Sequence, residues 1–166
     1  LLDAAGNSHQ EAELKGVEEY VIECSILKVA CSEHTQITAD EGIQIMGGMG
    51  YSAETPMQTA WRDTRIARIY EGTNEINRML SVGMLIKKAM KGQLDLIGPA
   101  TAVGEELLGI PDFAIPDFSE PLSQEKHILK NLKKVFLMIA GAGVQKYGTE
   151  LEEHQQLLLA VADILI

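Results

Sequence analysis

The sequence predicts an all-α protein, an up-down helical bundle followed by a further C-terminal helical extension. Only 5% of the residues are aromatic, and few runs alternate apolar with polar residues. Leu, Ile, Met and Ala instead recur at intervals of three and four, and no proline occurs before Pro56. At 166 residues and 46% hydrophobic composition, the chain can bury one sizeable core of packed helices.

The N-terminal part carries signals for a short helix and a long one. Residues 8–11 match a capping box, so we expect a helix from about His9 that Gly16 would interrupt. The long helix is expected from Val17 to Met46 and buried on two sides, because two apolar stripes run along it. The stripes are Val17, Tyr20, Val21, Cys24, Leu27 and Cys31, and Ile22, Ile26, Val29 and Ala30. The two cysteines are too far apart for an unstrained disulfide and are expected as buried free thiols.

Glycines and a proline divide the middle of the chain. Gly47, Gly48 and Gly50 end the long helix, and a simple C-cap explains them without any ligand. They are no dinucleotide fingerprint of the Rossmann type, since they follow a helix and lack the spacing. A loop over residues 51–58 and an arginine-bearing helix to about Tyr70 should follow. After a break at 71–72, a helix is expected over 74–92.

The C-terminal part differs from the rest of the chain in its pattern of glycines and prolines. Between Gln93 and Pro121 we expect a short helix over 101–108 and an extended linker anchored by Phe113 and Phe118. Ser123 should cap an amphipathic helix with a lysine face, and glycines 141, 143 and 148 should precede a last helix from about 149. The expected domains are 1–92, 93–122 and 123–166. The last ends in an apolar run without a cap, which predicts that the chain continues in a larger polypeptide.

Charge and composition restrict the partners. A net charge of −10 argues against a general nucleic-acid binder, although residues 62–91 carry seven cationic side chains against three acidic ones. This basic region fits an anionic ligand or a solvated helix face equally well. No signal peptide or membrane-spanning run is present in the sequence, which predicts a soluble protein. The four histidines lack partners at metal-ligand spacing, so no metal site is expected.

Glu71 is the strongest candidate for a chemical role. It follows an apolar and arginine-rich helix, and Gly72 after it permits backbone conformations that other residues avoid. Thr73 is a good N-cap for the next helix, with Glu75 in its first turn. Flanked by Ile69 and Tyr70, Glu71 would be partly desolvated and its pKa raised, which suits a general base. An ordinary surface glutamate before a helix cap explains the same local pattern.

Two motifs in this region resemble the acyl-CoA dehydrogenase family. One is Arg62-Asp63 followed by residues 69–78, Ile-Tyr-Glu-Gly-Thr-Asn-Glu-Ile-Asn-Arg. The other is residues 44–51, Gln-Ile-Met-Gly-Gly-Met-Gly-Tyr. The similarity covers residues 20–92 well, and the remainder resembles the C-terminal extension of the very-long-chain branch more loosely.

The resemblance implies an FAD-dependent dehydrogenation of acyl-CoA, with long acyl chains, to trans-2-enoyl-CoA in fatty-acid β-oxidation. Glu71 would be the catalytic base and Gly72 would lie against the substrate. Some family members place the base elsewhere, but Glu is present here. The resemblance implies that Thr73, Asn74 and Glu75 contact FAD. It also implies that Gln44, Gly47 and Gly48 contact the FAD that is bound mainly by a neighbouring subunit.

The resemblance also implies partners and a location. Electron-transfer flavoprotein would accept the electrons. Peripheral membrane contact is implied for the lysine face of the helix after Ser123, which carries Lys126, Lys130, Lys133 and Lys134, although a core-packed helix with a solvated lysine face is the commoner reading of this pattern. The location would be the cytoplasm of a bacterium, or the mitochondrial matrix or inner-membrane surface of a eukaryote. Unmatched apolar faces predict a homo-oligomer. The alternative is a non-catalytic helical dimerisation module, because the family's β-domain and N-terminal helices, with most of the flavin site, are missing from this chain.

Overall fold

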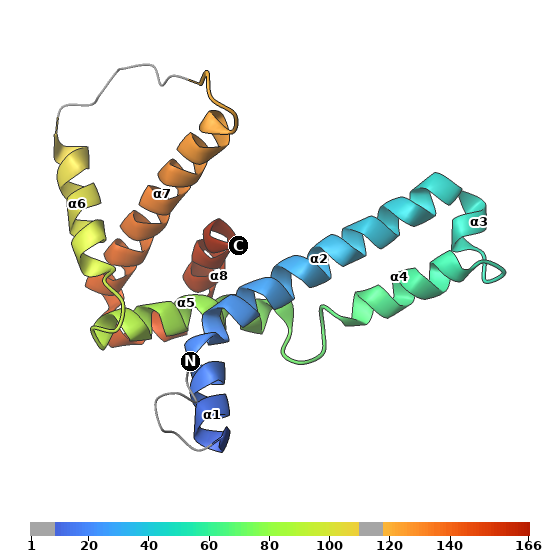
Figure 1. The fold of residues 1–166 in the computed structure, drawn as a ribbon, viewed down its shortest axis with the longest axis horizontal. Helices are drawn as coiled ribbons and strands as arrows, with labels where there is room; N and C mark the ends of the chain where they lie inside the picture. Colours follow the sequence, from blue (N-terminus) through green and yellow to red (C-terminus); the bar gives the residue numbers. More distant parts are fainter. Residues whose placement is uncertain (1–8, 110–117) are drawn as a thin grey trace. The chain divides into compact units, whose positions relative to one another are not determined.

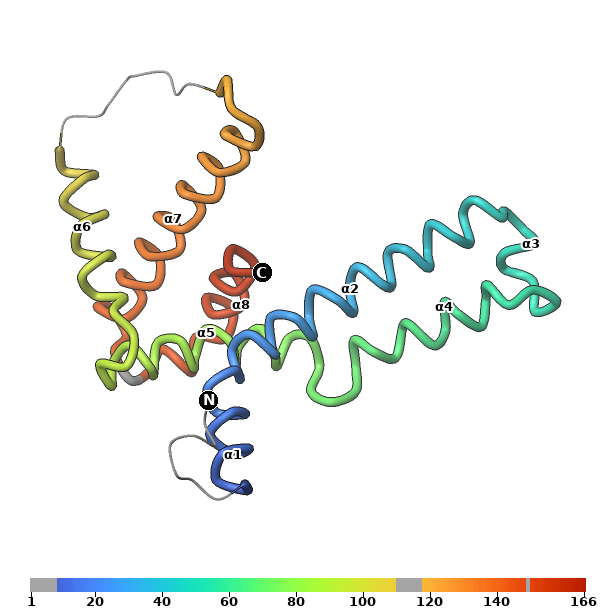
Figure 2. The backbone as a smooth tube through the Cα atoms, in the orientation of Figure 1, coloured from blue at the N-terminus to red at the C-terminus, as the bar shows by residue number. Residues whose placement is uncertain are grey.

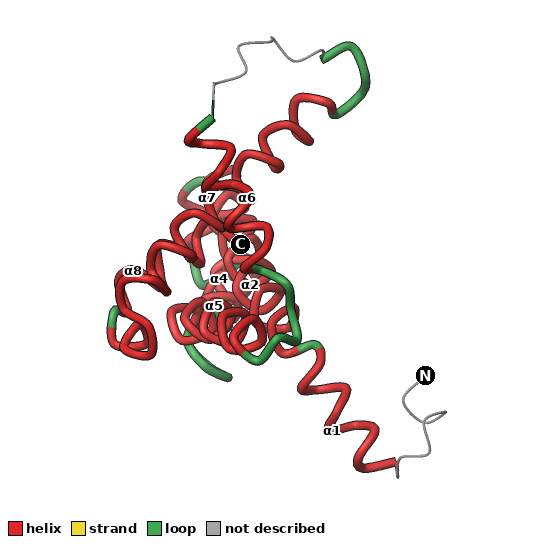
Figure 3. Tube along the Cα trace, turned by 90° about the vertical axis from the view of Figure 1, so that its left-hand side faces the viewer, coloured by secondary structure: helices red, strands yellow, loops and turns green. Residues whose placement is uncertain are grey.

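The computed structural model describes residues 9–109 and 118–166, and within these ranges it contains helices, turns and bends but no strand (Figure 1, Figure 3). The predicted all-α class is confirmed. The chain divides into two compact units, the first ending at Ser81 and the second running from Val82 to Leu165. The division falls inside one helix.

The first unit is built on a helical hairpin. It contains α1 (His9–Glu19), α2 (Val21–Met46), α3 (Gly48–Tyr51), α4 (Pro56–Ile66) and the first part of α5 (Asn74–Met90). α2 and α4 pack side by side in opposite directions, with α3 at the turn between them (Figure 2). Trp61 Nε1 donates to Asp40 Oδ1 at 3.0 Å across this hairpin. The long straight α2 therefore presents one face to α4.

α2 buries a single face rather than two. Its buried residues follow the helical period and are Ile22, Ser25, Val29, Ser32, Gln36 and Ala39. The stripe through Cys24, Leu27 and Cys31 is exposed, so the prediction of burial on both sides is wrong for this chain. Both thiols are free as expected but are exposed. The reason is that the elements of the first unit pack on one side of α2 only.

Several boundaries in the first unit differ from expectation. The proposed cap Ser8 lies outside the described residues, and the interruption comes at Tyr20 rather than at Gly16, which is inside α1. α3 lies within the expected glycine break and reaches the expected loop only at Tyr51, and α4 begins at Pro56, a residue favoured in the first helical turn. α4 ends at Ile66, before the expected Tyr70. The predicted end of α2 is confirmed.

The second unit contains the end of α5, α6 (Ile97–Leu108), α7 (Ser123–Tyr147), the 3-10 helix η2 (Gly148–Glu153) and α8 (Gln155–Leu165). α6 starts earlier than expected. Leu96 occupies its cap position without a side-chain capping bond, and Asp95 Oδ1, one residue before it, accepts the first-turn amide of Gly98 at 3.1 Å. Within the described ranges, no helix is long and apolar enough to cross a membrane.

α7 departs from the sequence prediction at both ends. Ser123 is its first residue and makes no capping bond; Leu122, with φ +60°, occupies the cap position. The helix continues through Gly141 and Gly143 and ends at Tyr147, with Gly148 as its C-cap. Gly143 lies close to Leu151, and a Cβ there would be 3.4 Å from the leucine Cδ1, so the small residue permits packing rather than breaking the helix. Of the two proposed linker anchors, Phe113 lies outside the described residues and Phe118 contacts the ring of His127.

Candidate functional site

The segment between α4 and α5 reverses the chain through two left-handed residues. Glu71 has φ +54° and Gly72 has φ +82°. The amide of Asn74 donates to the carbonyl oxygen of Arg68 at 3.1 Å and closes the reversal. A Cβ on Gly72 would lie 3.0 Å from Asn77 Nδ2, so glycine is required here both by conformation and by space.

Glu71 itself is exposed in this chain. The expected partial desolvation by Ile69 and Tyr70 is therefore wrong for the chain by itself, because both neighbours are also about half exposed. The reversal turns the carboxylate towards solvent. The Glu71 carboxylate is therefore accessible to a ligand that approaches from solvent.

The start of α5 confirms the predicted cap. Thr73 Oγ1 accepts the amide of Ile76 at 3.2 Å. Glu75 lies in the first turn of this helix. Its carboxylate accepts a hydrogen bond from the backbone amide of Glu75 itself and one from the Thr73 hydroxyl, and these bonds hold the pKa of Glu75 below its ordinary value. Glu75 is thus an exposed carboxylate at the positive end of a helix.

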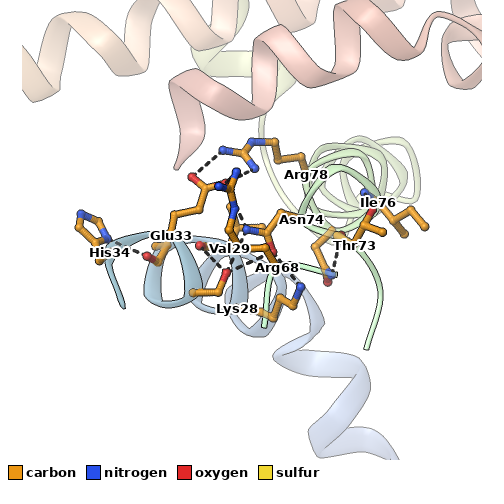
Figure 4. A network of polar contacts seen from close by, with 12 residues as sticks. Lys28, Val29, Glu33, His34, Arg68, Thr73, Asn74, Ile76 and Arg78 are labelled. Atoms are coloured by element: carbon orange, nitrogen blue, oxygen red, sulfur yellow. Dashed lines mark hydrogen bonds and ion pairs between the residues drawn. The ribbon is translucent and has the colours of Figure 1, made fainter. Parts of the chain in front are cut away.

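A polar network lies beneath the reversal, and we call Lys28, Ser32, Glu33, Asn74 and Arg78 the Asn74 network (Figure 4). Lys28 Nζ donates to the Gly72 carbonyl oxygen at 2.7 Å and to Asn74 Oδ1 at 2.8 Å. Asn74 is 0% exposed, and its amide nitrogen donates to Glu33 Oε1 at 3.1 Å. The network joins α2 to the residues that follow Glu71.

The anionic member of the network is Glu33. Arg78 meets it with two parallel bonds, Nη1 to Oε1 at 2.8 Å and Nη2 to Oε2 at 2.9 Å. This forked pairing, with weaker contributions from the Asn74 hydrogen bond and then from the charge of Arg68, keeps the pKa of Glu33 below its ordinary value. The pair therefore ties the first turns of α5 to α2.

The second set of candidates lies at the far end of α2. Gln44, Gly47 and Gly48 are exposed, and Gly47 has φ +60°. No atom lies within 4 Å of a Cβ built on either glycine, so their backbone is open. Gln44 follows Glu33 by eleven residues, which is roughly 16 Å along a helix. The structure therefore keeps this set apart from the segment at Glu71.

Sequence reasoning missed three members of the Asn74 network, Lys28, Ser32 and Glu33. The available signal was weak: Lys28 and Ser32 are polar residues spaced by one helical turn beside an apolar stripe. Among the residues that the structure describes, no group of His, Cys, Asp or Glu side chains could hold a metal ion.

Comparison with known families gives a consistent result. Two family profiles, both described as "Acyl-CoA dehydrogenase, C-terminal domain", match residues 3–84 and 131–166, together more than half of the chain. The probable acyl-CoA dehydrogenase of Bacillus subtilis (strain 168) is 45% identical over 155 residues, covering 91% of this chain and 25% of that protein. The mitochondrial very long-chain specific enzyme of Mus musculus is 40% identical over 93 residues, 56% of this chain and 13% of that protein.

A relative that matches a shorter stretch of the chain and a solved structure indicate the same family. The human mitochondrial short-chain specific acyl-CoA dehydrogenase is 43% identical over 68 residues, 41% of this chain and 16% of that protein. The crystal structure of an acyl-CoA dehydrogenase complexed with FAD from Bacillus anthracis has a TM-score of 0.84 and 43% identity. It matches 98% of this chain, which covers 28% of that chain. The chain thus spans about a quarter of the relatives that it matches along most of its length.

Proposed function

The chain belongs to the acyl-CoA dehydrogenase family, and we propose that it forms part of an FAD-dependent enzyme that converts acyl-CoA thioesters to trans-2-enoyl-CoA. One observation carries the proposal. Glu71, an exposed carboxylate, stands on a left-handed backbone reversal that a partly buried polar network supports from below. This arrangement offers a base whose backbone is fixed while its side chain faces outward.

In the proposed reaction, Glu71 removes a proton from the α-carbon of the thioester. That proton is weakly acidic, so a positioned base is needed, and such a base contributes roughly 10²–10⁴-fold to the rate. Gly72 has no side chain and lets the substrate lie against the backbone. FAD, when bound, supplies the acceptor for the hydride that leaves the β-carbon.

The proposed cofactor residues fit a dinucleotide in different ways. Gly47 and Gly48 present bare, open backbone to an approaching phosphate, and Gln44 is exposed beside them. Thr73 and Glu75 offer oxygen acceptors that suit hydroxyl groups. The side chain of Asn74 is fully buried in its network, so we propose that Asn74 supports Thr73 and Glu75 from below.

The two cofactor sets lie at different ends of the helical hairpin. We therefore assign Gln44, Gly47 and Gly48 to FAD held mainly by a neighbouring subunit, as the resemblance implies. This assignment requires a homo-oligomer. Electron-transfer flavoprotein is the proposed electron acceptor, and exposed Lys126, Lys130 and Lys133 on α7 are the proposed peripheral membrane contact.

Acyl chain length and pathway are finer proposals. The relatives include both short-chain and very long-chain enzymes, so we base a long-chain preference, and a place in fatty-acid β-oxidation, on the extension after Gly92. The full-length enzyme should be assayed on short and long acyl-CoA substrates. A clear short-chain optimum would contradict the preference.

Substitution of Glu71 by Gln in the full-length enzyme tests the proposed base. We expect the rate of acyl-CoA dehydrogenation to fall by about 10²–10⁴-fold with the flavin content unchanged. Glu54→Gln, at an exposed position before α4, is the matched control and should keep the parental rate. Full activity of Glu71→Gln would show that the base is elsewhere.

A non-catalytic helical module is the second candidate, favoured by the short share of each relative that the chain spans. The visible spectrum of the purified chain separates the two candidates. A stoichiometric flavin band would contradict an inert module.

A further inference from the structure

We infer that Lys28 is a positioning residue that holds the Glu71–Gly72 backbone in its left-handed conformation. The inference rests on the proposed function. Lys28 lies on α2, 44 residues before Gly72, and its ammonium group donates to the Gly72 carbonyl oxygen at 2.7 Å. Figure 4 shows the side chain reaching from α2 towards the start of α5.

The Gly72 carbonyl oxygen has a second donor. Asn77 Nδ2 approaches it at 2.9 Å, so the oxygen is bonded from two sides. Two donors on one carbonyl oxygen fix the direction of the peptide plane between Gly72 and Thr73. A fixed plane restricts rotation at Gly72, and with it the orientation of the residue before. Loss of the charged donor would leave only the neutral one.

The position of Lys28 is itself determined by charge. Asn74 Oδ1 accepts from Lys28 at 2.8 Å, and Asn74 Nδ2 donates to Glu33 at 3.1 Å. A flipped amide would place its NH₂ group against the ammonium and its oxygen against the carboxylate, and both contacts would repel. Arg78 in turn holds the Glu33 carboxylate with two bonds. Charge therefore favours the observed series of contacts, which runs from Arg78 through Glu33, Asn74 and Lys28 to Gly72.

Such a clamp should affect catalysis more than binding. Proton transfer requires the base within hydrogen-bond reach of the substrate carbon, and a displacement of about 1 Å can cost 10²-fold. Substrate affinity draws on many contacts along the ligand, so a small rotation at Glu71 should change it little. A merely structural lysine would lower the amount of folded enzyme and its flavin content instead.

The experiment uses the full-length enzyme with Lys28→Met, Lys28→Arg and Lys28→Gln. For Lys28→Met we expect kcat to fall about 10–100-fold, with KM within about twofold and the flavin content unchanged. Lys28→Arg keeps the charge and the donors and should recover part of kcat. Amide hydrogen exchange at Asn74, whose N–H is bonded to Arg68, should be about tenfold faster in Lys28→Met. Lys146→Met, at an exposed site on α7, is the matched control and should change neither quantity.

Parental kcat and parental exchange in Lys28→Met would overturn the inference. So would a loss of flavin and of kcat in equal proportion that arginine fails to recover. If Lys28→Met yields no soluble enzyme, arginine must still retain more kcat than glutamine at this position. An enzyme that fails to dehydrogenate any acyl-CoA refutes the proposed function, whereas the exchange measurement still decides whether Lys28 holds the backbone.

Discussion

Glu71 occupies a backbone conformation that costs stability. In the described part of the chain, Glu71 and Leu122 are the two non-glycine residues with positive φ, at +54° and +60°. For such residues the left-handed region costs roughly 1–2 kcal/mol. Glu71 keeps this conformation because the reversal that bears it is bonded to α2 and to α5. The strain lies at the residue proposed to do the chemistry, as is common at functional sites.

Replacing each strained residue by glycine separates stability from function. We expect Glu71→Gly to raise the free energy of unfolding by about 0.5–1 kcal/mol, since glycine adopts this conformation without the Cβ clash but loses more chain entropy. The same variant should abolish dehydrogenation. Leu122→Gly should gain similar stability with full activity. Thermal unfolding and a turnover assay check both, and a destabilised Glu71→Gly would mean that the side chain supports the fold.

Gly72 should tolerate no side chain. In Gly72→Ala the new Cβ would lie 3.0 Å from Asn77 Nδ2 and would disturb the bond to the Gly72 carbonyl. We expect a loss of about 2–3 kcal/mol of unfolding free energy and of most activity. Gly92→Ala is the control: φ is +69° but no atom lies within 4 Å, so only the conformational cost of about 1 kcal/mol remains. Equal losses in urea unfolding would show that the contact with Asn77 is unimportant.

At the scale of elements, the pair Glu33 and Arg78 ties α2 to α5, and its strength depends on pH. The pKa of Glu33 is held below its ordinary value of 4.5. The carboxylate therefore stabilises the folded state fully above about pH 4.5, and this contribution is lost as the pH falls through the lowered pKa.

Glu33→Gln should remove this dependence. At pH 7 we expect the variant to be less stable by about 1–3 kcal/mol, because a charged, forked hydrogen bond is lost. The difference from the parent should shrink as the pH falls below about 4.5. Urea unfolding at several pH values measures it, with Glu41→Gln at an exposed position of α2 as the control. A constant difference down to pH 3 would contradict the assignment.

The turn between α2 and α3 offers a test of the cofactor proposal that leaves the fold intact. Gly48 has open space around it, whereas a Cβ on Gly50 would lie 2.8 Å from the carbonyl oxygen of Ile43. We expect Gly48→Ala to keep the unfolding midpoint but to lower the flavin content of the full-length enzyme. Gly50→Ala should lower both. Parental flavin content in Gly48→Ala would remove this glycine from the proposed cofactor set.

Features set by local chemistry could be predicted from the sequence. The end of α2 at Gly47 and the cap of α5 by Thr73 depend on residues within one turn, and both predictions are confirmed. The early end of α4 could not be predicted, because it is coupled to a bond between Asn74 and Arg68 across the reversal. The contact of Lys28 with Gly72 spans 44 residues, and no local pattern encodes it.

At the scale of the whole molecule, burial was the least predictable property. The two stripes of α2 look alike in the sequence, yet the structure covers only the one that includes Val29, which is 0% exposed. Which stripe is covered depends on where α4 and α5 pack, and packing partners distant in sequence are not encoded in the period of a single helix. The uncovered stripe is thus the part of α2 that another subunit or domain could bury.

We predict that this stripe drives self-association. Leu27 is 59% exposed, and Cys24 and Cys31 lie one turn away on either side. Burying a few hundred Å² of apolar surface stabilises an assembly by several kcal/mol at about 25 cal/mol per Å². The chain should therefore form a homodimer or higher oligomer at micromolar concentration, even without FAD, and Leu27→Lys should shift light scattering towards the monomer. Leu108→Lys, at a 91% exposed position on α6, should leave the assembly unchanged. A monodisperse monomer of the parental chain would show that the stripe stays exposed without a partner copy.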